Sequence, residues 1–524
     1  MHARHPLTAA IALLLVFAIP ARAAAAIPEI TVIDINPGDD GYSYALDKST
    51  TGQAAVGNRI FFSADSASGH GQLWVSNGTT SGTHLVKTLS PSGGDDIMYI
   101  VAFGDSVMFR ANDDVHGLEL WISDGTASGT HMVKDINDVV DEGAGDGRTF
   151  SSDPMSLYYW KGAIYFSADD GSNGKELWKS DGTESGTVQV KNISAGNGNG
   201  YPGDFVALGS QLLFTAQDDT YGNELWSTDG TQAGTQLVKN INPTGDSYPY
   251  QLVKSGNTVF FMAETDDSGY ELWKSDGTSG GTDRVADLVP GSGQGNISGQ
   301  TLTAFNGGVV FRRLDISGGT GSELWKSDGT DAGTVIVKDI NPDAGHSVPD
   351  GLSVMGNYVY FSANDGTAGT ELWRSDGTAA GTKLVKDIWD GADAGASPIE
   401  YSGIVSNGVH AYFFATAPND VNGDATEIWR TDGTAAGTVQ IGVAGLNSQS
   451  FCDNCNSPAI LIAGNRVFFR TWTETALNEL GIIVDGSLPS TDREGGTGTK
   501  FLVIAAAITA AAGALLRRGE GRIN

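Results

Sequence analysis

Pairs of aspartates recur along the chain and are its most prominent candidates for chemistry. They are Asp113, Asp114, Asp169, Asp170, Asp218, Asp219, Asp266 and Asp267. Clustered carboxylates with neighbouring backbone carbonyls suit calcium, a hard cation that takes about six to eight oxygen ligands. These segments lack the spacing of an established calcium motif, so Asx-turns on a solvated acidic rim are the simpler interpretation. Calcium at these eight residues is therefore a prediction that stands beside that alternative.

Residue types that could catalyse a reaction are scattered rather than grouped. Arg110, Arg312 and Arg470 stand where other repeats have Ser or Thr, and arginines together can hold a carboxylate or a sulfate. They fall in the second, sixth and ninth repeats, which favours drift at a tolerant position. The sequence contains no GxSxG, HExxH or phosphate-cradling loop. It therefore predicts no catalytic residue and no residue that binds an organic cofactor.

The two cysteines of the chain lie close together, at Cys452 and Cys455. In an exported protein such a pair forms a small local disulfide or stays reduced. A structural zinc site would need a second pair of ligands. Redox catalysis is not expected, because no thioredoxin-like βαβ pattern surrounds the pair.

The bulk composition narrows the class of protein. The chain has 524 residues, a formal net charge of −31 and 72 glycines. The negative charge argues against nucleic acid as a partner, because a phosphate backbone demands clustered Lys and Arg. The glycine content favours many turns and leaves little room for long helices.

A tryptophan repeat indicates which elements must position these residues. Eight tryptophans follow a Leu or Ile and precede the same Asp-Gly-Thr turn, which is Asn-Gly-Thr in the first copy. They are Trp74, Trp121, Trp178, Trp226, Trp273, Trp325, Trp373 and Trp429. They lie about 50 residues apart, a period typical of repeat architectures. We expect each tryptophan to pack between neighbouring units rather than to stack on a ligand.

Each repeat contains four short runs typical of β-strands, separated by turns rich in Gly and Asp. In the fourth repeat these runs are residues 205–208, 212–216, 224–227 and 236–241. The strands are apolar on both faces, so each sheet must be covered on both sides. Radially arranged four-stranded sheets satisfy this condition. The sequence therefore predicts an all-β fold, with a single β-propeller over residues 30–485.

The repeat count predicts how the ring closes. Eight repeats are complete, and a ninth that begins near residue 459 lacks its fourth strand. Residues 30–37 stand alone at the other end and match a fourth strand such as residues 335–342. This N-terminal strand can complete the last blade and remove the exposed edges. We expect about nine blades; eight blades with a loose ninth unit, or two smaller propellers, are the alternatives.

The repeat motif resembles a known family. Residues 176–183 read Glu-Leu-Trp-Lys-Ser-Asp-Gly-Thr and residues 371–378 read Glu-Leu-Trp-Arg-Ser-Asp-Gly-Thr. They resemble the ELWxxDGT repeat of bacterial exported proteins, and the likeness covers roughly residues 30 to 485. The resemblance implies export and a surface location, and it carries over no catalytic residue.

Both ends of the chain have the features of processing signals. Residues 1–23 combine basic residues, an apolar run and a small-x-small site ending at Ala23, which is typical of a signal peptide. Residues 500–518 combine an apolar stretch with a basic tail, which is typical of a transmembrane anchor. The linker 486–499 contains Leu-Pro-Ser-Thr-Asp, which resembles the LPxTG sorting motif with Asp492 in place of Gly.

These features together predict an exported, non-catalytic propeller tethered to the cell surface, or released from it after processing. Its role would be binding, adhesion or envelope structure, with calcium as the candidate cofactor. We expect a monomeric ring whose partner is a surface glycan or a protein, and whose C-terminal helix enters the membrane. The alternative is a polysaccharide-acting hydrolase or lyase on the same scaffold.

Overall fold

The computed structural model describes residues 30–35, 45–46, 52–66, 69–143, 147–288, 302–314, 319–343, 345–389, 403–417, 425–441, 460–471 and 479–486. The predicted signal peptide, the predicted anchor, Cys452 and Cys455 lie outside these residues, as does the linker beyond residue 486. Within the described residues, no helix is long and apolar enough to cross a membrane.

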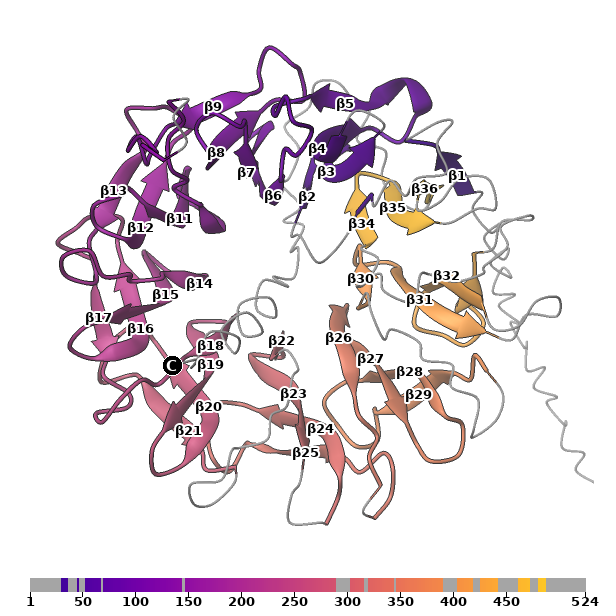
Figure 1. The fold of residues 1–524 in the computed structure, drawn as a ribbon. Helices are drawn as coiled ribbons and strands as arrows, with labels where there is room; N and C mark the ends of the chain where they lie inside the picture. The colour runs from indigo at the N-terminus through magenta and orange to yellow at the C-terminus, as the bar shows by residue number, and fades with distance from the viewer. Residues whose placement is uncertain are drawn as a thin grey trace, which may run out of the picture.

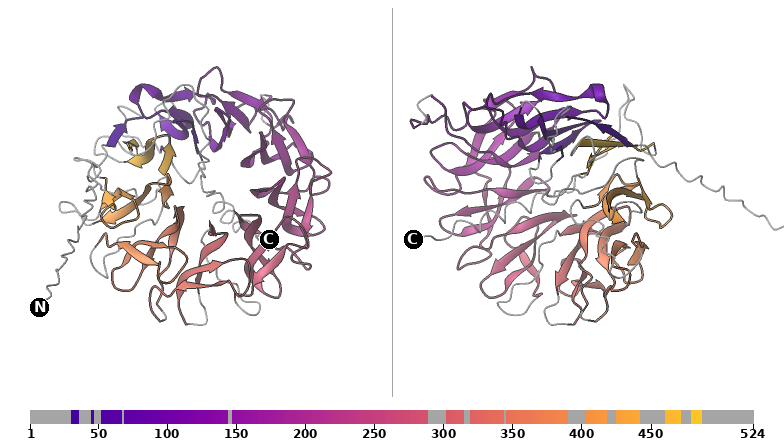
Figure 2. Two further views of the ribbon diagram at one scale, coloured as in Figure 1. Left: turned by 180° about the vertical axis from the view of Figure 1, so that it is seen from behind. Right: turned by 45° about the vertical axis from the view of Figure 1, so that its right-hand side comes forward.

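Nine four-stranded antiparallel sheets stand around a common axis and form one β-propeller (Figure 1). The ring is also continuous when it is seen from behind (Figure 2). The first strand of each blade is innermost and the fourth is outermost in blades 1 to 8. The all-β prediction and the count of nine blades are confirmed, and the alternatives of eight blades or two smaller rings are wrong.

The strands are short, as the spacing of the turns predicts, and a short 3-10 helix spans Thr80–Gly82. In chain order, blades 1 to 8 consist of β2 (Gln53–Val56), β3 (Arg59–Ser66), β4 (Gly69–Ser76), β5 (Thr83–Lys87); β6 (Met98–Phe103), β7 (Ser106–Asn112), β8 (Leu118–Ser123), β9 (His131–Lys134); β10 (Met155–Trp160), β11 (Ala163–Asp169), β12 (Lys175–Ser180), β13 (Val188–Lys191); β14 (Gly203–Leu208), β15 (Gln211–Asp218), β16 (Gly222–Thr228), β17 (Gln236–Lys239); β18 (Tyr250–Ser255), β19 (Thr258–Thr265), β20 (Gly269–Ser275), β21 (Asp283–Ala286); β22 (Thr303–Phe305), β23 (Gly308–Leu314), β24 (Ser322–Ser327), β25 (Val335–Lys338); β26 (Asp350–Met355), β27 (Tyr358–Asn364), β28 (Thr370–Ser375), β29 (Lys383–Lys386); β30 (Val405–Ser406), β31 (Ala411–Ala417), β32 (Ala425–Thr431), β33 (Val439–Gln440).

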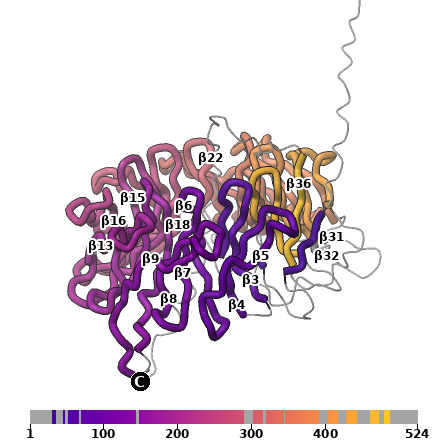
Figure 3. The backbone as a smooth tube through the Cα atoms, turned by 90° about the horizontal axis from the view of Figure 1, so that it is seen from above, coloured from indigo at the N-terminus to yellow at the C-terminus, as the bar shows by residue number. Residues whose placement is uncertain are grey.

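The ninth blade joins the two ends of the propeller. It consists of β34 (Ile460–Ala463), β35 (Arg466–Thr471), β36 (Glu479–Val484) and the N-terminal strand β1 (Ile30–Ile33). β1 pairs with β36 from Ile30 opposite Ile483 to Ile33 opposite Leu480. Figure 3 shows these first and last segments together at one side of the ring. Closure by the N-terminal strand, as the sequence predicts, leaves no unpaired outer edge on β36.

The tryptophans contribute to the apolar contacts between neighbouring blades. Trp121 of blade 2 belongs to one buried cluster with Phe61 and Val86 of blade 1. Trp178 of blade 3 belongs to another with Met108 of blade 2. Seven of the eight tryptophans are only 5–8% exposed, whereas Trp325 is half-buried. Removing a buried side chain of this size costs about 3–5 kcal/mol, so these contacts are a large part of what holds the ring together.

Each Asp-Gly-Thr turn is closed by its own side chains. Asp181 Oδ1 accepts the backbone N–H of Thr183 at 3.0 Å and its hydroxyl at 2.7 Å. Gly182 has φ of +88°, a left-handed conformation that favours glycine. The hydrogen bonds from Thr183 hold the pKa of Asp181 below its usual value. The same pair of bonds recurs at Asn77, Asp124, Asp229, Asp276, Asp328, Asp376 and Asp432.

Basic side chains connect each of blades 1 to 7 to the blade that follows it. Lys134 Nζ donates to the carbonyl of Thr187 at 3.1 Å and lies 5.8 Å from the ring centroid of Trp178. Lys179 Nζ, from the third strand of blade 3, donates to the carbonyl of Gly230 in blade 4 at 2.9 Å. Equivalent bonds across blade boundaries begin at Lys87, Lys274, Lys326, Lys338, Arg374 and Lys386. The motif therefore supplies cationic contacts between blades as well as the tryptophan.

Candidate functional site

The eight aspartates predicted to bind calcium lie in or beside the loops between the second and third strands. They lie on the same face of the ring as the loops that connect each blade to the next. We call this face the loop face. Asp113 accepts the backbone N–H groups of Val115 and His116 at 3.0 and 2.7 Å. Asp170 and Asp218 each accept two backbone N–H groups in the same way. These three side chains close Asx-turns within their own loops.

Three further aspartates hold the loop of the preceding blade. Asp266 accepts the hydroxyl of Thr244 at 2.5 Å and the amide of Asn242 at 3.3 Å. Asp114 and Asp219 accept serine hydroxyls from the preceding loop. Their carboxylates therefore connect neighbouring blades at the loop face.

The remaining two aspartates also bond locally. Asp169 accepts the N–H of Gly171 at 2.7 Å, and Asp267 accepts the hydroxyl of Thr265 at 2.6 Å. The eight acids thus lie in four different blades. Among the described residues, no group of three or more His, Cys, Asp or Glu side chains is placed to hold a metal ion. Calcium binding at these residues stays a prediction.

A buried glutamate, which precedes the Leu-Trp pair of the motif, fixes the loop that enters the next blade. Glu119 is fully buried and accepts the N–H of Ser152 at 2.8 Å, its hydroxyl at 2.6 Å and the N–H of Ile136 at 3.0 Å. Burial raises the pKa of Glu119 to about 8, against these donors, which lower it. Equivalent bonds to the next loop are made by Glu176, Glu224, Glu271, Glu323, Glu371 and Glu479. The sequence shows this glutamate two residues before seven of the eight tryptophans, with Gln72 in the first repeat, but it does not show the role of the side chain.

Beyond this loop, five blades place one residue in a left-handed backbone at the entrance to the inner strand. We call these residues the inner rim: Asp96, Asp153, Tyr201, Tyr248 and Val348, with φ of 50°, 47°, 43°, 40° and 47°. Each lies two residues before an inner strand, and a bulge follows in that strand. Such conformations cost a non-glycine residue about 1–3 kcal/mol. The side chains of the inner rim vary while the backbone repeats, so this is where individual blades can differ in chemistry.

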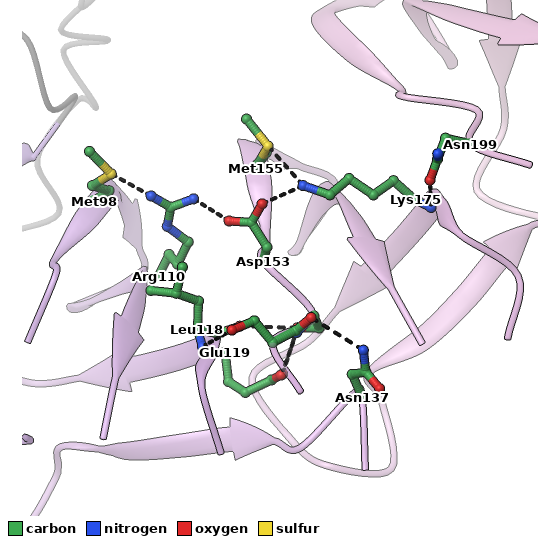
Figure 4. Close-up of polar contacts among 11 residues, drawn as sticks. Met98, Arg110, Leu118, Glu119, Asn137, Asp153, Met155, Lys175 and Asn199 are labelled. Atoms are coloured by element: carbon green, nitrogen blue, oxygen red, sulfur yellow. Dashed lines mark hydrogen bonds and ion pairs between the residues drawn. The ribbon is translucent and has the colours of Figure 1, made fainter. Parts of the chain in front are cut away.

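At blades 2 and 3, the inner rim carries a cluster of opposite charges (Figure 4). The carboxylate of Asp153 accepts Arg110 Nη1 at one oxygen and Lys175 Nζ at the other. Arg110 comes from β7 of blade 2, whereas Asp153 and Lys175 belong to blade 3. The side chains are 11%, 28% and 19% exposed in the order Arg110, Asp153, Lys175. The cluster is therefore largely buried but open to a small group from outside.

The two cations have more donors than Asp153 can satisfy. Arg110 Nη2 points at the thioether of Met98, a weak acceptor, and Arg110 Nε is buried with no hydrogen-bond partner among the described residues. The second contact of Lys175 Nζ is the thioether of Met155 at 3.3 Å. The ring of Tyr99 lies 5.1 Å from the Arg110 guanidinium. The cluster carries one net positive charge and unsatisfied donors, and it can accept a second anionic oxygen group.

The three arginines noted in the sequence do not come together. Arg110 joins the cluster described above, Arg312 lies on β23 of blade 6, and Arg470 is fully buried on β35 of blade 9. Burial lowers the pKa of Arg312. His410, whose partner the sequence could not show, lies with Nδ1 2.9 Å from Asp485 Oδ2 at the boundary of blades 8 and 9. The three arginines are therefore spread around the ring, as their places in the second, sixth and ninth repeats predict.

Comparisons with known proteins find likeness only among solved structures. No protein-family model and no curated protein matches the chain. A puromycin hydrolase S511A mutant complexed with PGG matches at 13% identity and a TM-score of 0.36, over 71% of this chain and 58% of that one. A structure from a study of two prolyl endopeptidases matches at 10% identity and 0.38, over 74% and 55%. An uncharacterized protein of Listeria monocytogenes EGD-e matches at 10% and 0.34, over 60% and 88%.

These matches bear on the function that the sequence predicts. The prediction of a non-catalytic binding or adhesion module is contradicted, because the matches with a named activity are hydrolytic enzymes, and it is wrong as stated. This chain spans little more than half the length of those enzymes. At such identities and TM-scores the likeness concerns the fold alone, and it assigns no activity to this chain.

Proposed function

We propose that the protein recognises its ligand through a carboxylate, which Arg110 and Lys175 receive at the inner rim between blades 2 and 3. The observation that carries this proposal is the surplus of donors around Asp153. A second carboxylate would replace the weak thioether contacts with charge-assisted hydrogen bonds. Such bonds contribute about 1.5–3 kcal/mol each.

The site is held in place before any ligand arrives. Glu119 binds the backbone and hydroxyl of Ser152, and Asp153 follows directly. The N–H of Asp153 also donates to the carbonyl of Leu118 at 2.9 Å. Because these bonds fix the backbone, little conformational freedom remains to be lost on binding. Preorganisation of this kind raises affinity without adding a contact.

The neighbouring inner rim offers aromatic surface for the rest of the ligand. Tyr201 and Tyr248, in the two following blades, are 38% and 41% exposed. The hydroxyl of Tyr248 donates to Asp246 at 3.0 Å, which orients the ring. An extended molecule with a carboxylate at one end and apolar groups along its length fits this arrangement. A peptide with a free C-terminus is the ligand class that we propose.

Titration calorimetry with a matched pair of peptides tests this proposal. The probes are an acetylated Ala-Phe-Ala with a free carboxylate and the same peptide with a C-terminal amide, added to the full chain. We expect the acid to bind and the amide to bind at least about tenfold more weakly, because one charge-assisted bond is worth about 1.5–3 kcal/mol. Equal binding of the two peptides would contradict the proposal. Mass spectrometry of the same samples shows whether the peptide is cleaved.

Variants locate the binding to the cluster. Arg110→Met and Lys175→Met each remove one cation while keeping an unbranched apolar side chain. We expect each to weaken binding of the acid by about 10- to 100-fold. Lys254→Met is the matched control, because Lys254 is an exposed cation of an inner strand two blades away. A loss of binding in the control as well would mean that overall charge, not the cluster, determines binding.

We also propose, from the sequence, that residues 1–23 direct export and that residues 500–518 anchor the chain in a membrane. Basic residues, an apolar run and a small-x-small site support the first assignment, and an apolar stretch with a basic tail supports the second. Protease treatment of intact cells tests it, because an exported ring is degraded while a cytoplasmic one is protected.

A further inference from the structure

A second site lies on the loop face between blades 4 and 5, further from the axis than the inner rim. A cavity of about 500 Å³ opens there between the loop that leaves blade 4 and the outer strands of blade 5. Its volume falls within the range of small-molecule sites, about 300–1,000 Å³. The polar residues of its wall are Asn242, Thr244, Thr265, Asp266, Asp267, Trp273 and Arg284.

The cavity lies where the repeat is broken by a charged residue. In each blade, the residue opposite the repeat tryptophan on the fourth strand is set by the strand register. In blade 5 this residue is Arg284, opposite Trp273. The equivalent positions in other blades hold Leu85, Met132, Gln189, Leu237, Ile336, Leu384 and Gln440. Blade 5 therefore has a cation where those blades have an uncharged side chain.

The wall presents donors that lack acceptors. The indole N–H of Trp273, like those of the other seven repeat tryptophans, is buried without a hydrogen-bond partner among the described residues, which costs about 1–3 kcal/mol if no acceptor is supplied. Trp273 is the one of these eight that forms part of this cavity wall. Among the described residues, Arg284 Nη2 forms an ion pair with Asp287 Oδ2 at the long distance of 3.9 Å, so its guanidinium keeps donors for another group. Both residues form part of the cavity wall.

The wall also presents acceptors that are already oriented. Asp266 is held by Thr244 and Asn242, and these hydrogen bonds keep its pKa below its usual value. Asp267 is held by the hydroxyl of Thr265. A carboxylate has about four lone-pair positions, so both side chains retain acceptor capacity. The cavity wall thus combines the donors of Trp273 and Arg284 with the acceptors of Asp266 and Asp267.

We infer that this cavity binds a neutral, hydroxyl-rich molecule, namely a sugar or another polyol. A hydroxyl group donates one hydrogen bond and accepts two, so a row of hydroxyls satisfies both the donors and the acceptors of the wall. A simple anion would face Asp266 and Asp267, and a simple cation would face Arg284 and the N–H of Trp273. The site uses no residue of the Arg110 cluster, so its test is independent of the test of the proposed carboxylate site.

Saturation-transfer NMR on the full chain tests the inference, with glucose and sorbitol as neutral probes. Acetate and alanine serve as the anionic and zwitterionic probes, and tetramethylammonium chloride, whose methyl protons can be observed, serves as the cationic probe. We expect signals for glucose or sorbitol and none for acetate or alanine at the same concentrations. Binding of the charged probes without the polyols would overturn the inference. The absence of any polyol signal at about 100 mM would also overturn it, because we take this concentration as the weakest dissociation constant of interest.

Arg284→Leu is the decisive variant, because leucine is the residue that blades 1, 4 and 7 carry at this position. The variant should fold, and it should lose at least about tenfold in affinity for the polyol, as expected for a bond to a charged group. Gln189→Leu makes the matched change in blade 3 and should leave polyol binding unchanged. Trp273→Phe keeps the ring and removes the N–H, and it should weaken binding as well. Full polyol binding by Arg284→Leu would refute the assignment.

Discussion

Glu119→Gln tests how the buried carboxyl group supports the ring. Burial raises the pKa of Glu119 from 4.5 to about 8 in the folded state. Because the folded pKa is the higher one, the stabilisation by the bound proton is complete below about pH 4.5 and is lost as the pH rises through about 8. The difference between these two pKa values corresponds to about 5 kcal/mol of folding free energy, at about 1.36 kcal/mol per pH unit. About 3 kcal/mol of this falls between pH 5.5 and 8.5.

The substitution separates titration from hydrogen bonding. Glutamine cannot titrate, so the variant should lose the part of the pH dependence that belongs to this side chain. Its amide N–H group would meet the N–H groups of Ile136 and Ser152, and the lost bond costs about 1–3 kcal/mol. Blade 1 tolerates Gln72 at the equivalent position because the hydroxyl of Thr88 accepts its amide at 3.2 Å.

Thermal and urea unfolding of the full chain, followed from pH 5.5 to 8.5, provide the assay. We expect Glu119→Gln to be less stable than the parent at pH 5.5, and its stability to change less with pH by up to about 3 kcal/mol. Glu184→Gln, which removes one exposed carboxylate from a turn, controls for net charge. If Glu119→Gln follows the same pH profile as the parent and this control, the carboxyl group does not titrate as argued and the reasoning is refuted.

Three further predictions concern the blade contacts and the cluster. Lys134→Met should lower the free energy of unfolding by about 1–3 kcal/mol in urea, because it removes the bond to the next blade and the contact with Trp178; an unchanged midpoint would contradict this. Deleting residues 24–33 should expose the edge of β36 and produce dimers or aggregates by size-exclusion chromatography, whereas a stable monomer would show that the N-terminal strand is dispensable. Asp153→Asn should lower thermal stability, because two cations lose their partner, and a free-carboxylate peptide should restore more stability to it than to the parent. Equal stabilisation of both proteins would count against the cluster as a carboxylate site.

The sequence was sufficient for the architecture because the same pattern recurs in eight of the nine repeats. Trp178 and its equivalents mark the third strand, and Asp181 and its equivalents mark the turn that follows it. The isolated strand at Ile30 could be matched to the gap in the last blade by pattern alone. Repetition averages out the local ambiguity of short strands, so nine blades could be counted without knowledge of how they pack.

The candidate site could be predicted only in part, because it depends on contacts between blades. Arg110 stood out as a break in the repeat, but its partner Asp153 is an ordinary loop residue in the sequence. The left-handed backbone of the inner rim has no residue signature, since Asp, Tyr and Val all occupy it. Arg284 was not noticed, because its significance depends on the register between β20 and β21. The repeated glutamate was visible, but its role depends on donors in a loop that lies elsewhere in the sequence.

A crystal structure of the full chain with the free-carboxylate peptide tests the central claim most directly. The account predicts that the terminal carboxylate lies between Arg110 and Lys175, within hydrogen-bond distance of both, while Asp153 keeps its place. A peptide carboxylate bound at another position, with the Arg110 cluster unchanged and unoccupied at saturating peptide, would contradict it.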